Sequence, residues 1–152
     1  MPTRKQFVYT FQGQCMALVL AALHEMSGIN TKQQTIAYIE KKGWFDLQPE
    51  DLESYPTHKY EAKWHTMIAF GRQWCADAGL VTPHQERDKW EISAFGAERL
   101  AGVREKFKTG VYDVKCGYLW SPVFKKWLCP DYEPSARDLK RPPNLSNEYE
   151  FA

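Results

Sequence analysis

The sequence lacks an excess of charge of either sign, and this absence limits the partners that it can attract. Its 152 residues contain 20 Lys and Arg against 19 Asp and Glu, which gives a formal net charge of +1. A nucleic-acid partner would therefore have to be recognised through local placement of charge, because the whole chain has no strong positive field.

Long apolar runs and internal repeats are missing as well. No apolar run reaches the roughly 18 residues of a membrane-spanning helix. The longest run, residues 15–23, is separated from the basic start of the chain by Gln12, Gly13 and Gln14, unlike a signal peptide. We therefore expect a soluble, cytoplasmic protein without a membrane partner. Hydrophobic residues make up 43% of the chain and aromatic residues 14%, so a buried core is expected.

The four cysteines include no C-x-x-C pair. Cys15 and Cys75 lie inside apolar helical patterns, so we predict that they are reduced and serve in packing. A zinc site built from Cys116, Cys129 and a histidine stays open as an alternative, although no ligand spacing supports it. The sequence also lacks a nucleophile–base pair, a phosphate-binding glycine loop and a metal cluster. We therefore predict no catalytic residue, no metal and no cofactor.

Apolar residues recur at helical spacing in four segments, and Pro49 begins a short helix or turn between the second and the third. The four segments are residues 14–26, 31–42, 60–78 and 94–107. The third segment is strongly amphipathic over about five turns. Gly71 lies on its buried side, where the missing side chain would let another helix approach closely.

A short hairpin is predicted between the last two helices. Residues 80–82 and 89–92 have strand character, and a polar loop over residues 83–88 joins them. The order of helix, helix, short helix, long helix, hairpin and helix is typical of a winged helix-turn-helix, in which the long helix reads DNA and the hairpin is the wing. The predicted fold class is therefore mainly α with a small β-hairpin.

The predicted domain organisation has three parts. An N-terminal arm covers residues 1–13, the winged-helix domain covers residues 14–107, and a C-terminal extension rich in aromatic residues and proline covers residues 108–152. The extension contains the aromatic residues Tyr112, Tyr118, Trp120, Phe124 and Trp127. They either pack on the domain as additional core or form a contact with a homodimer mate or another protein.

Three motifs within residues 14–107 resemble the winged-helix domain at the N-terminus of Mrr-type restriction endonucleases. They are "DLESYP", "W-x3-I-x2-G-R-x-W-x-x-D-A-G-L-V" and "RDKWEISAFGAERL". The positions that match the family pattern are Asp51-Leu52, Ala78-Gly79-Leu80-Val81, Arg87, Trp90, Ser93 and Gly96. The resemblance implies double-stranded DNA as a partner, because such domains help to choose the DNA that is cut, in some cases by its modified bases.

The chain departs from the family pattern in ways that bear on activity. Arg87-Asp88-Lys89 stands where the family has Arg-Gly before the wing tryptophan, and Cys75 stands where a leucine is usual. The nuclease domain is missing. Asp113-Val114-Lys115 and Pro130-Asp131 carry fragments of its metal-binding motif in reversed order, in an extension too short for its sheet. We therefore expect no nuclease activity.

The candidate DNA contacts fall into two groups. The start and outer side of the long helix carry Lys59, Lys63, His65, Thr66 and Gln73. The tip of the predicted wing carries His84, Gln85, Arg87 and Lys89. Thr and Gln can bond base edges, Lys pairs with phosphate, and Arg suits the minor groove. The ordinary alternatives are a solvated helix side and a polar loop balanced by Glu86 and Asp88.

The tryptophans allow a further interpretation. Trp44, Trp64, Trp74 and Trp90 could stack on a modified base, but packing in the core is the commoner role and is the one that we predict.

The sequence thus predicts a non-enzymatic DNA-binding protein, acting in transcriptional control or in restriction and phage defence. The alternative is a protein-interaction winged helix that recruits or inhibits a nuclease or another defence protein.

Overall fold

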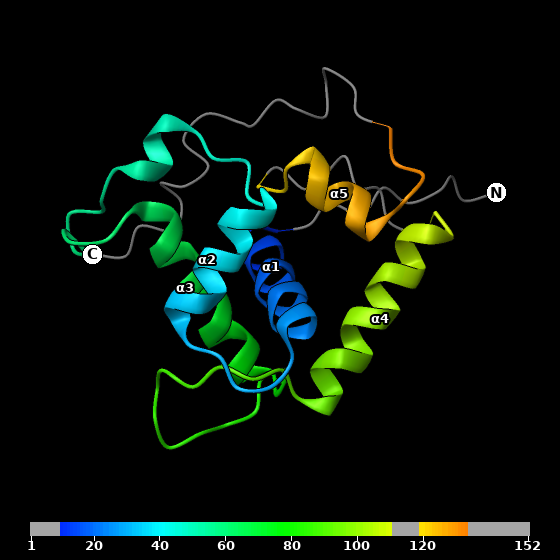
Figure 1. The fold of residues 1–152 in the computed structure, drawn as a ribbon, viewed down its shortest axis with the longest axis horizontal. Coiled ribbons are helices and arrows are strands. Elements are labelled where there is room, and N and C mark those ends of the chain that lie inside the picture. Colours follow the sequence, from blue (N-terminus) through cyan, green and yellow to red (C-terminus); the bar gives the residue numbers. More distant parts are fainter. Residues whose placement is uncertain (1–9, 111–118, 134–152) are drawn as a thin grey trace.

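The computed structural model describes residues 10–110 and 119–133 and is built from helices (Figure 1). Its elements are α1 (Phe11–Met26), α2 (Lys32–Lys42), the short 3-10 helix η1 (Pro49–Leu52), α3 (Lys63–Asp77), α4 (Ala94–Lys108) and α5 (Pro122–Leu128). In Figure 1, α1 lies at the centre, with α2 and α3 on one side and α4 on the other. None of the described helices combines the length and apolar character that crossing a membrane requires.

Helix α1 forms the core around which the other helices pack. Most of its residues from Phe11 to Leu23 are buried, so it is apolar on nearly all sides, as expected of a central helix. The Thr10 side chain caps its start by accepting a hydrogen bond of 3.0 Å from the Gly13 amide. The other helices therefore need only one apolar side each.

The contact between α1 and α3 is close because of Gly71. A Cβ atom added at Gly71 would lie 2.9 Å from the backbone carbon of Cys15, a distance that real Cβ atoms do not adopt. Trp64, Ile68 and Cys75 are buried along the same side of α3. The prediction that Gly71 permits a close helix approach is confirmed.

The predicted β-hairpin wing is wrong. The described residues contain no β-strand, and residues 80–92 form only isolated bridges between Val81 and Ile92 and between Trp90 and Asn30. Pro83 follows Thr82 directly and has no amide to extend the ladder. Trp90 exchanges backbone hydrogen bonds of 2.6 and 2.7 Å with Asn30. Its amide and carbonyl groups therefore bond to a residue outside the expected hairpin.

The described part of the aromatic extension packs on the helices. Trp120 and Phe124 are buried, and the Trp120 indole donates a hydrogen bond of 3.1 Å to the Gln14 carbonyl. The ring centroid of Phe124 lies 5.0 Å from that of Trp44. These rings are therefore part of the core. Tyr112, Tyr118 and Cys116 lie outside the described residues.

Helix α4 begins as predicted but turns one aromatic side chain outward. The Ser93 hydroxyl caps it by accepting a hydrogen bond of 2.9 Å from the Gly96 amide. Leu100 is buried as expected, whereas Phe95, which the apolar spacing also places inside, is 48% exposed. The side of α4 that carries Phe95 is therefore only partly covered by α1.

Two glycines of α4 provide a test of this packing. A Cβ atom at Gly96 would lie 2.1 Å from the Leu80 carbonyl oxygen, whereas one at Gly102 would meet nothing within 4 Å. We expect Gly96→Ala to lower the free energy of unfolding by about 2 kcal/mol or more, and Gly102→Ala to raise it by about 0.5–1 kcal/mol through better helix propensity. Urea unfolding followed by circular dichroism measures both. Equal effects of the two changes would contradict the packing of α4 on Leu80.

Candidate nucleic-acid interface

Most of the predicted DNA contacts lie in two segments, residues 57–65 and 84–89, and both segments contact the start of α2. The segment before α3, the start of α2 and the loop over residues 83–89 therefore meet on one surface. We call this surface, formed by residues 57–65, residues 84–89 and Lys32, the α2–α3 face. Gln73 lies on α3 beyond it.

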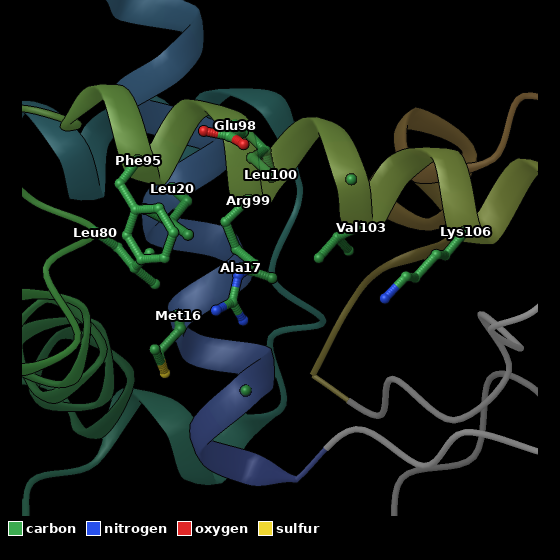
Figure 2. Close-up of a pocket in the computed structure, with 12 residues that line it drawn as sticks. Met16, Ala17, Leu20, Leu80, Phe95, Glu98, Arg99, Leu100, Val103 and Lys106 are labelled. Carbon is green, nitrogen blue, oxygen red and sulfur yellow. The ribbon is translucent and has the colours of Figure 1, made fainter.

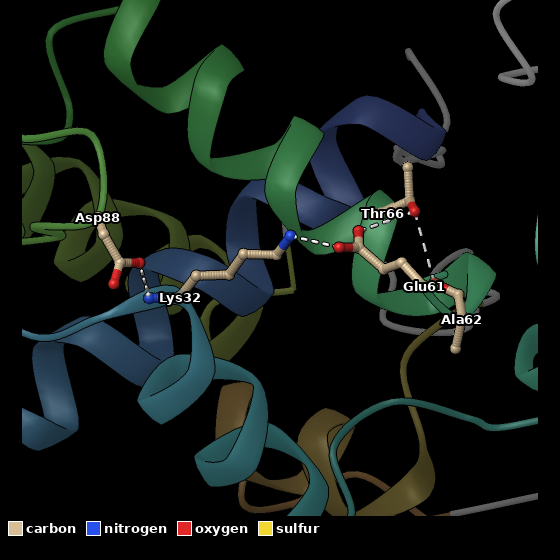
Figure 3. Close-up of polar contacts among 5 residues, drawn as sticks. All are labelled: Lys32, Glu61, Ala62, Thr66 and Asp88. Atoms are coloured by element: carbon tan, nitrogen blue, oxygen red, sulfur yellow. Dashed lines mark hydrogen bonds and ion pairs between the residues drawn. The ribbon is translucent and has the colours of Figure 1, made fainter. Parts of the chain in front are cut away.

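Lys32 joins the two loops of the α2–α3 face (Figure 3). Its backbone amide donates a hydrogen bond of 3.1 Å to Asp88 Oδ1, and its ammonium lies 2.5 Å from Glu61 Oε2. One residue at the start of α2 therefore contacts the segment before α3 and also the 83–89 loop. The two loops are held in a fixed relation by side chains far apart in the sequence.

Glu61 lies just before the start of α3, which has no side-chain cap. The cap position is Ala62, whose side chain makes no capping hydrogen bond. The Glu61 carboxylate accepts a hydrogen bond of 2.9 Å from the Thr66 hydroxyl in addition to the contact with Lys32. Burial alone would raise the pKa of Glu61, but the hydrogen bonds from Lys32 and Thr66 and the nearby positive charge lower it overall. Glu61 therefore stays ionised and neutralised by its neighbours.

Asp88 is bonded to the start of α2. The Thr31 hydroxyl accepts a hydrogen bond from the Gln34 amide, and Asp88 accepts one from the Lys32 amide, so the first turn of α2 is capped from two sides. A carboxylate is stabilised at this position by the positive end of the helix dipole. One carboxylate oxygen of Asp88 is therefore bonded to the helix start, although the residue itself is exposed.

The predicted lysines of the face are accessible. Lys59 is exposed, and the Lys63 ammonium lies 5.4 Å from the centroid of the Tyr55 ring, at the start of α3. A cation held over an aromatic ring keeps its charge while losing some freedom. Tyr60, between the two lysines, is fully exposed.

His65 is half-buried, with its ring 4.5 Å from the Trp64 ring in an edge-on arrangement. Burial lowers the pKa of the His65 ring, against the opposing effects of Glu61 and Glu40. At neutral pH the ring is therefore uncharged and can act as a hydrogen-bonding group but adds no positive charge to the face.

Thr66 and Gln73 are placed differently from the predicted outer side of the helix. Thr66 is 2% exposed, and its hydroxyl is bonded to Glu61. It is covered because α3 starts only at Lys63, whose amide donates a 2.6 Å hydrogen bond to the Glu53 carbonyl and folds the preceding segment back over the first turn. Gln73 is exposed, and its amide donates a hydrogen bond of 3.0 Å to Asp77.

The 83–89 loop presents the remaining predicted residues. Gln85 and Arg87 are exposed, Lys89 lies 3.6 Å from Glu86, and the His84 ring lies 3.1 Å from Glu91. The indole of Trp90 donates a hydrogen bond of 3.2 Å to the Arg87 carbonyl, which anchors the backbone of the loop. Arg87 is therefore a cation on an exposed loop with a fixed base.

Lys32, Glu61, Asp88 and Tyr60 contribute to this face without having been predicted. Lys32 contacts Glu61 and Asp88, which are 29 and 56 positions away in the sequence. A local sequence pattern cannot predict contacts over such separations. The position of Glu61 just before a helix is the one weak signal, since acidic residues favour helix starts.

The tryptophans do not form a ring-lined cage on the α2–α3 face. Trp44, Trp64 and Trp90 are buried in the core, and Trp74 is partly buried and stacks on Phe70 with a centroid distance of 5.9 Å. The prediction that these rings serve in packing is confirmed for the three buried ones.

Within residues 10–110 and 119–133, no three His, Cys, Asp or Glu side chains are grouped as metal ligands would be. Cys15 and Cys75 are buried and are not joined in disulfides, as predicted for packing residues. Burial raises the pKa of the Cys75 thiol, which keeps it protonated and poorly nucleophilic.

No protein-family model, curated protein or solved structure matches the chain.

The Glu61 contacts lead to a prediction about pH. Because the folded-state pKa of Glu61 lies below its ordinary value of 4.5, its contribution to stability is complete above that value and is lost as pH falls through the folded-state pKa. We expect Glu61→Gln to lower the free energy of unfolding by about 1 kcal/mol at neutral pH. The difference from the unchanged protein should shrink in more acidic solution.

Urea titrations at a series of pH values measure this difference. Glu98→Gln, at an exposed position on α4, is the matched control and should change stability little at any pH. A loss that stays constant from neutral to strongly acidic pH would show that the Glu61 charge is not the source of the effect.

Proposed function

We propose that this chain is a DNA-binding protein that contacts duplex DNA through the α2–α3 face. The observation that carries the proposal is the way in which this face compensates its acidic groups. Glu61 is bonded to Lys32 and Thr66, and Asp88 caps α2. These carboxylates are turned to partners within the protein, so they repel a DNA backbone less than free carboxylates would.

Two cations of the same face are exposed, and a third is partly exposed. Lys59 and Arg87 are exposed on the two loops that Lys32 holds in place, and Lys63 lies at the start of α3 over Tyr55. The backbone at the first turn of a helix adds a partial positive charge. Lysine and arginine side chains and the amides of a helix start all bind phosphate oxygens. A face of this kind can bind DNA even though the net charge of the chain is only +1.

The positions of the neutral side chains indicate how such binding would work. Thr66 is buried, and the Gln73 amide is bonded to Asp77, so neither is poised to read a base edge in this arrangement. Contacts from Lys59, Lys63 and Arg87 would go to the backbone. Binding would therefore depend weakly on sequence and strongly on salt.

The resemblance of residues 14–107 to the N-terminal domain of Mrr-type restriction endonucleases supports the same proposal. It implies a domain that selects DNA for another protein to act on, and the chain would then act by binding. In place of a wing, the exposed 83–89 loop would supply the second contact. Control of transcription and a role in restriction or phage defence are both compatible with such binding.

Charge reversal tests the proposal. We expect Lys63→Glu and Arg87→Glu each to weaken binding to a short duplex by about three- to tenfold at low salt. Each should also reduce the slope of log affinity against log salt by about 0.9, the contribution of one phosphate contact. Fluorescence anisotropy with a labelled duplex, at several salt concentrations, measures both quantities.

Lys108→Glu, an equal charge reversal at an exposed position at the end of α4, is the matched control and should leave affinity nearly unchanged. Circular dichroism of each variant checks that the helices are intact. Absence of binding at low salt, or equal weakening by all three changes, would reject this face as the DNA contact.

A further inference from the structure

A recess of about 380 Å³ lies on the α2–α3 face, between α2 and the segment before α3. We call it the Tyr60 recess. Its polar lining comprises Lys32, Gln33, Glu40, Tyr60, Glu61 and His65. This size falls within the range of about 300–1,000 Å³ found for ligand-binding clefts. The three cations proposed above as phosphate contacts are not part of its lining, so a DNA backbone held by them leaves the recess open.

Tyr60 borders this recess with an uncovered ring. Among the described residues it is the most exposed large hydrophobic side chain, and Leu52, at 63% exposure, comes next. Lys59 precedes it directly, and Lys63 follows three positions later. An open aromatic ring between cations is the combination with which proteins stack the bases of a strand while they hold its phosphates. The ring of Tyr60 is therefore placed to stack on a base.

The charges of the Tyr60 recess suit a base better than a phosphate. Lys32 and Glu61 lie 2.5 Å apart and neutralise each other (Figure 3). Glu40 is exposed and adds a negative charge. Burial lowers the pKa of the His65 ring, which is therefore uncharged at neutral pH. With one cation and two carboxylates, the lining repels a phosphate but accepts an uncharged base that carries N–H donors.

The hydrogen-bonding groups of the recess match guanine in particular. The Glu40 carboxylate only accepts hydrogen bonds, and a neutral imidazole such as that of His65 has one donor and one acceptor. Glu40 is near enough for its charge to act on the His65 ring, so both groups can reach one base. The pairing edge of guanine has two N–H donors beside a carbonyl oxygen. Thymine has one N–H between two carbonyl oxygens, which a carboxylate would repel.

Such a base has to be unpaired. Within a duplex the pairing edge is bonded to the opposite strand, and both faces of the base are stacked on neighbours. A base that is bulged or lies in a single strand presents its edge and one face. Ile36, which is 7% exposed, adds an apolar surface to the recess that the ring of a base can contact.

We infer that the Tyr60 recess binds an unpaired guanine of a DNA strand whose backbone lies on the α2–α3 face. Tyr60 stacks on the base, Glu40 accepts hydrogen bonds from its N1–H and its 2-amino group, and His65 donates one to O6. This inference rests on the proposed DNA contact and deepens it, because it adds a base contact to a face that otherwise contacts only phosphates.

Three labelled duplexes test the inference on the full chain. They share one sequence and differ in a single position, which is a bulged guanine, a bulged thymine or no bulge. We expect the chain to bind the guanine bulge about tenfold more tightly than the fully paired duplex, and about fivefold more tightly than the thymine bulge. Both bulges bend the duplex, so their comparison separates base contact from DNA shape. Fluorescence anisotropy at low salt gives the affinities.

Variants of the recess separate stacking from hydrogen bonding. Tyr60→Ala should reduce the preference for the guanine bulge over the paired duplex to about equality, whereas Tyr60→Phe should keep it. Glu40→Gln should bring the two bulges to within about twofold, because an amide can also donate to thymine. Glu98→Gln, on α4, is the matched control and should leave every ratio unchanged. The substituted residues are exposed, and circular dichroism checks that each variant is folded.

The outcomes distinguish failure of the recess from failure of the DNA face. Absence of binding to all three duplexes would reject the face and the recess together. Binding that Lys63→Glu weakens, without preference for the guanine bulge, would keep the face and reject the recess. Equal affinity for the two bulges would overturn the assignment of guanine, and a preference that survives Tyr60→Ala would overturn the stacking on Tyr60.

Discussion

The contact of Gly71 with the backbone of Cys15 is the constraint on which the arrangement of the molecule depends. It brings α3 directly against α1, a helix buried on nearly all sides, and so fixes which side of α3 is inside. With α1 and α3 in contact, the start of α3 lies beside the start of α2, and Lys32 can reach Glu61. A side chain at Gly71 would have to push these helices apart, and the polar contacts at the surface would separate with them.

The two sides of α1 present different kinds of surface. On the side of α2 and α3, carboxylates are paired inside the protein and cations project, which is suited to a polyanion. On the side of α4, an apolar recess is lined by Leu20, Phe95 and Val103 (Figure 2). The two surfaces share no side chain, so a substitution can change one without touching the other.

The helices were largely predictable because their signals are local. Helix α4 begins at Ala94 and α2 begins at Lys32, within one residue of the predicted segments, and the burial of Trp64 follows from its spacing. The hairpin was not predictable, because a short alternating pattern does not show whether its backbone groups pair with each other or with a distant segment, as Trp90 does with Asn30. The predicted exposure of Thr66 was wrong for a similar reason. A helical wheel cannot show that the segment before a helix folds back over its first turn.

What the sequence determined by itself was the position of the helices, the residues of the main core and the absence of strong net charge, all of which follow from local spacing and composition. Only the tertiary structure decided which charges face outward. Lys32 and Glu61 lie far apart in the sequence, and their contact turns a segment with balanced charge into a face with projecting cations. The groove beside α4 is also tertiary in origin, because Phe95 has the spacing of a core residue but is 48% exposed in the folded chain.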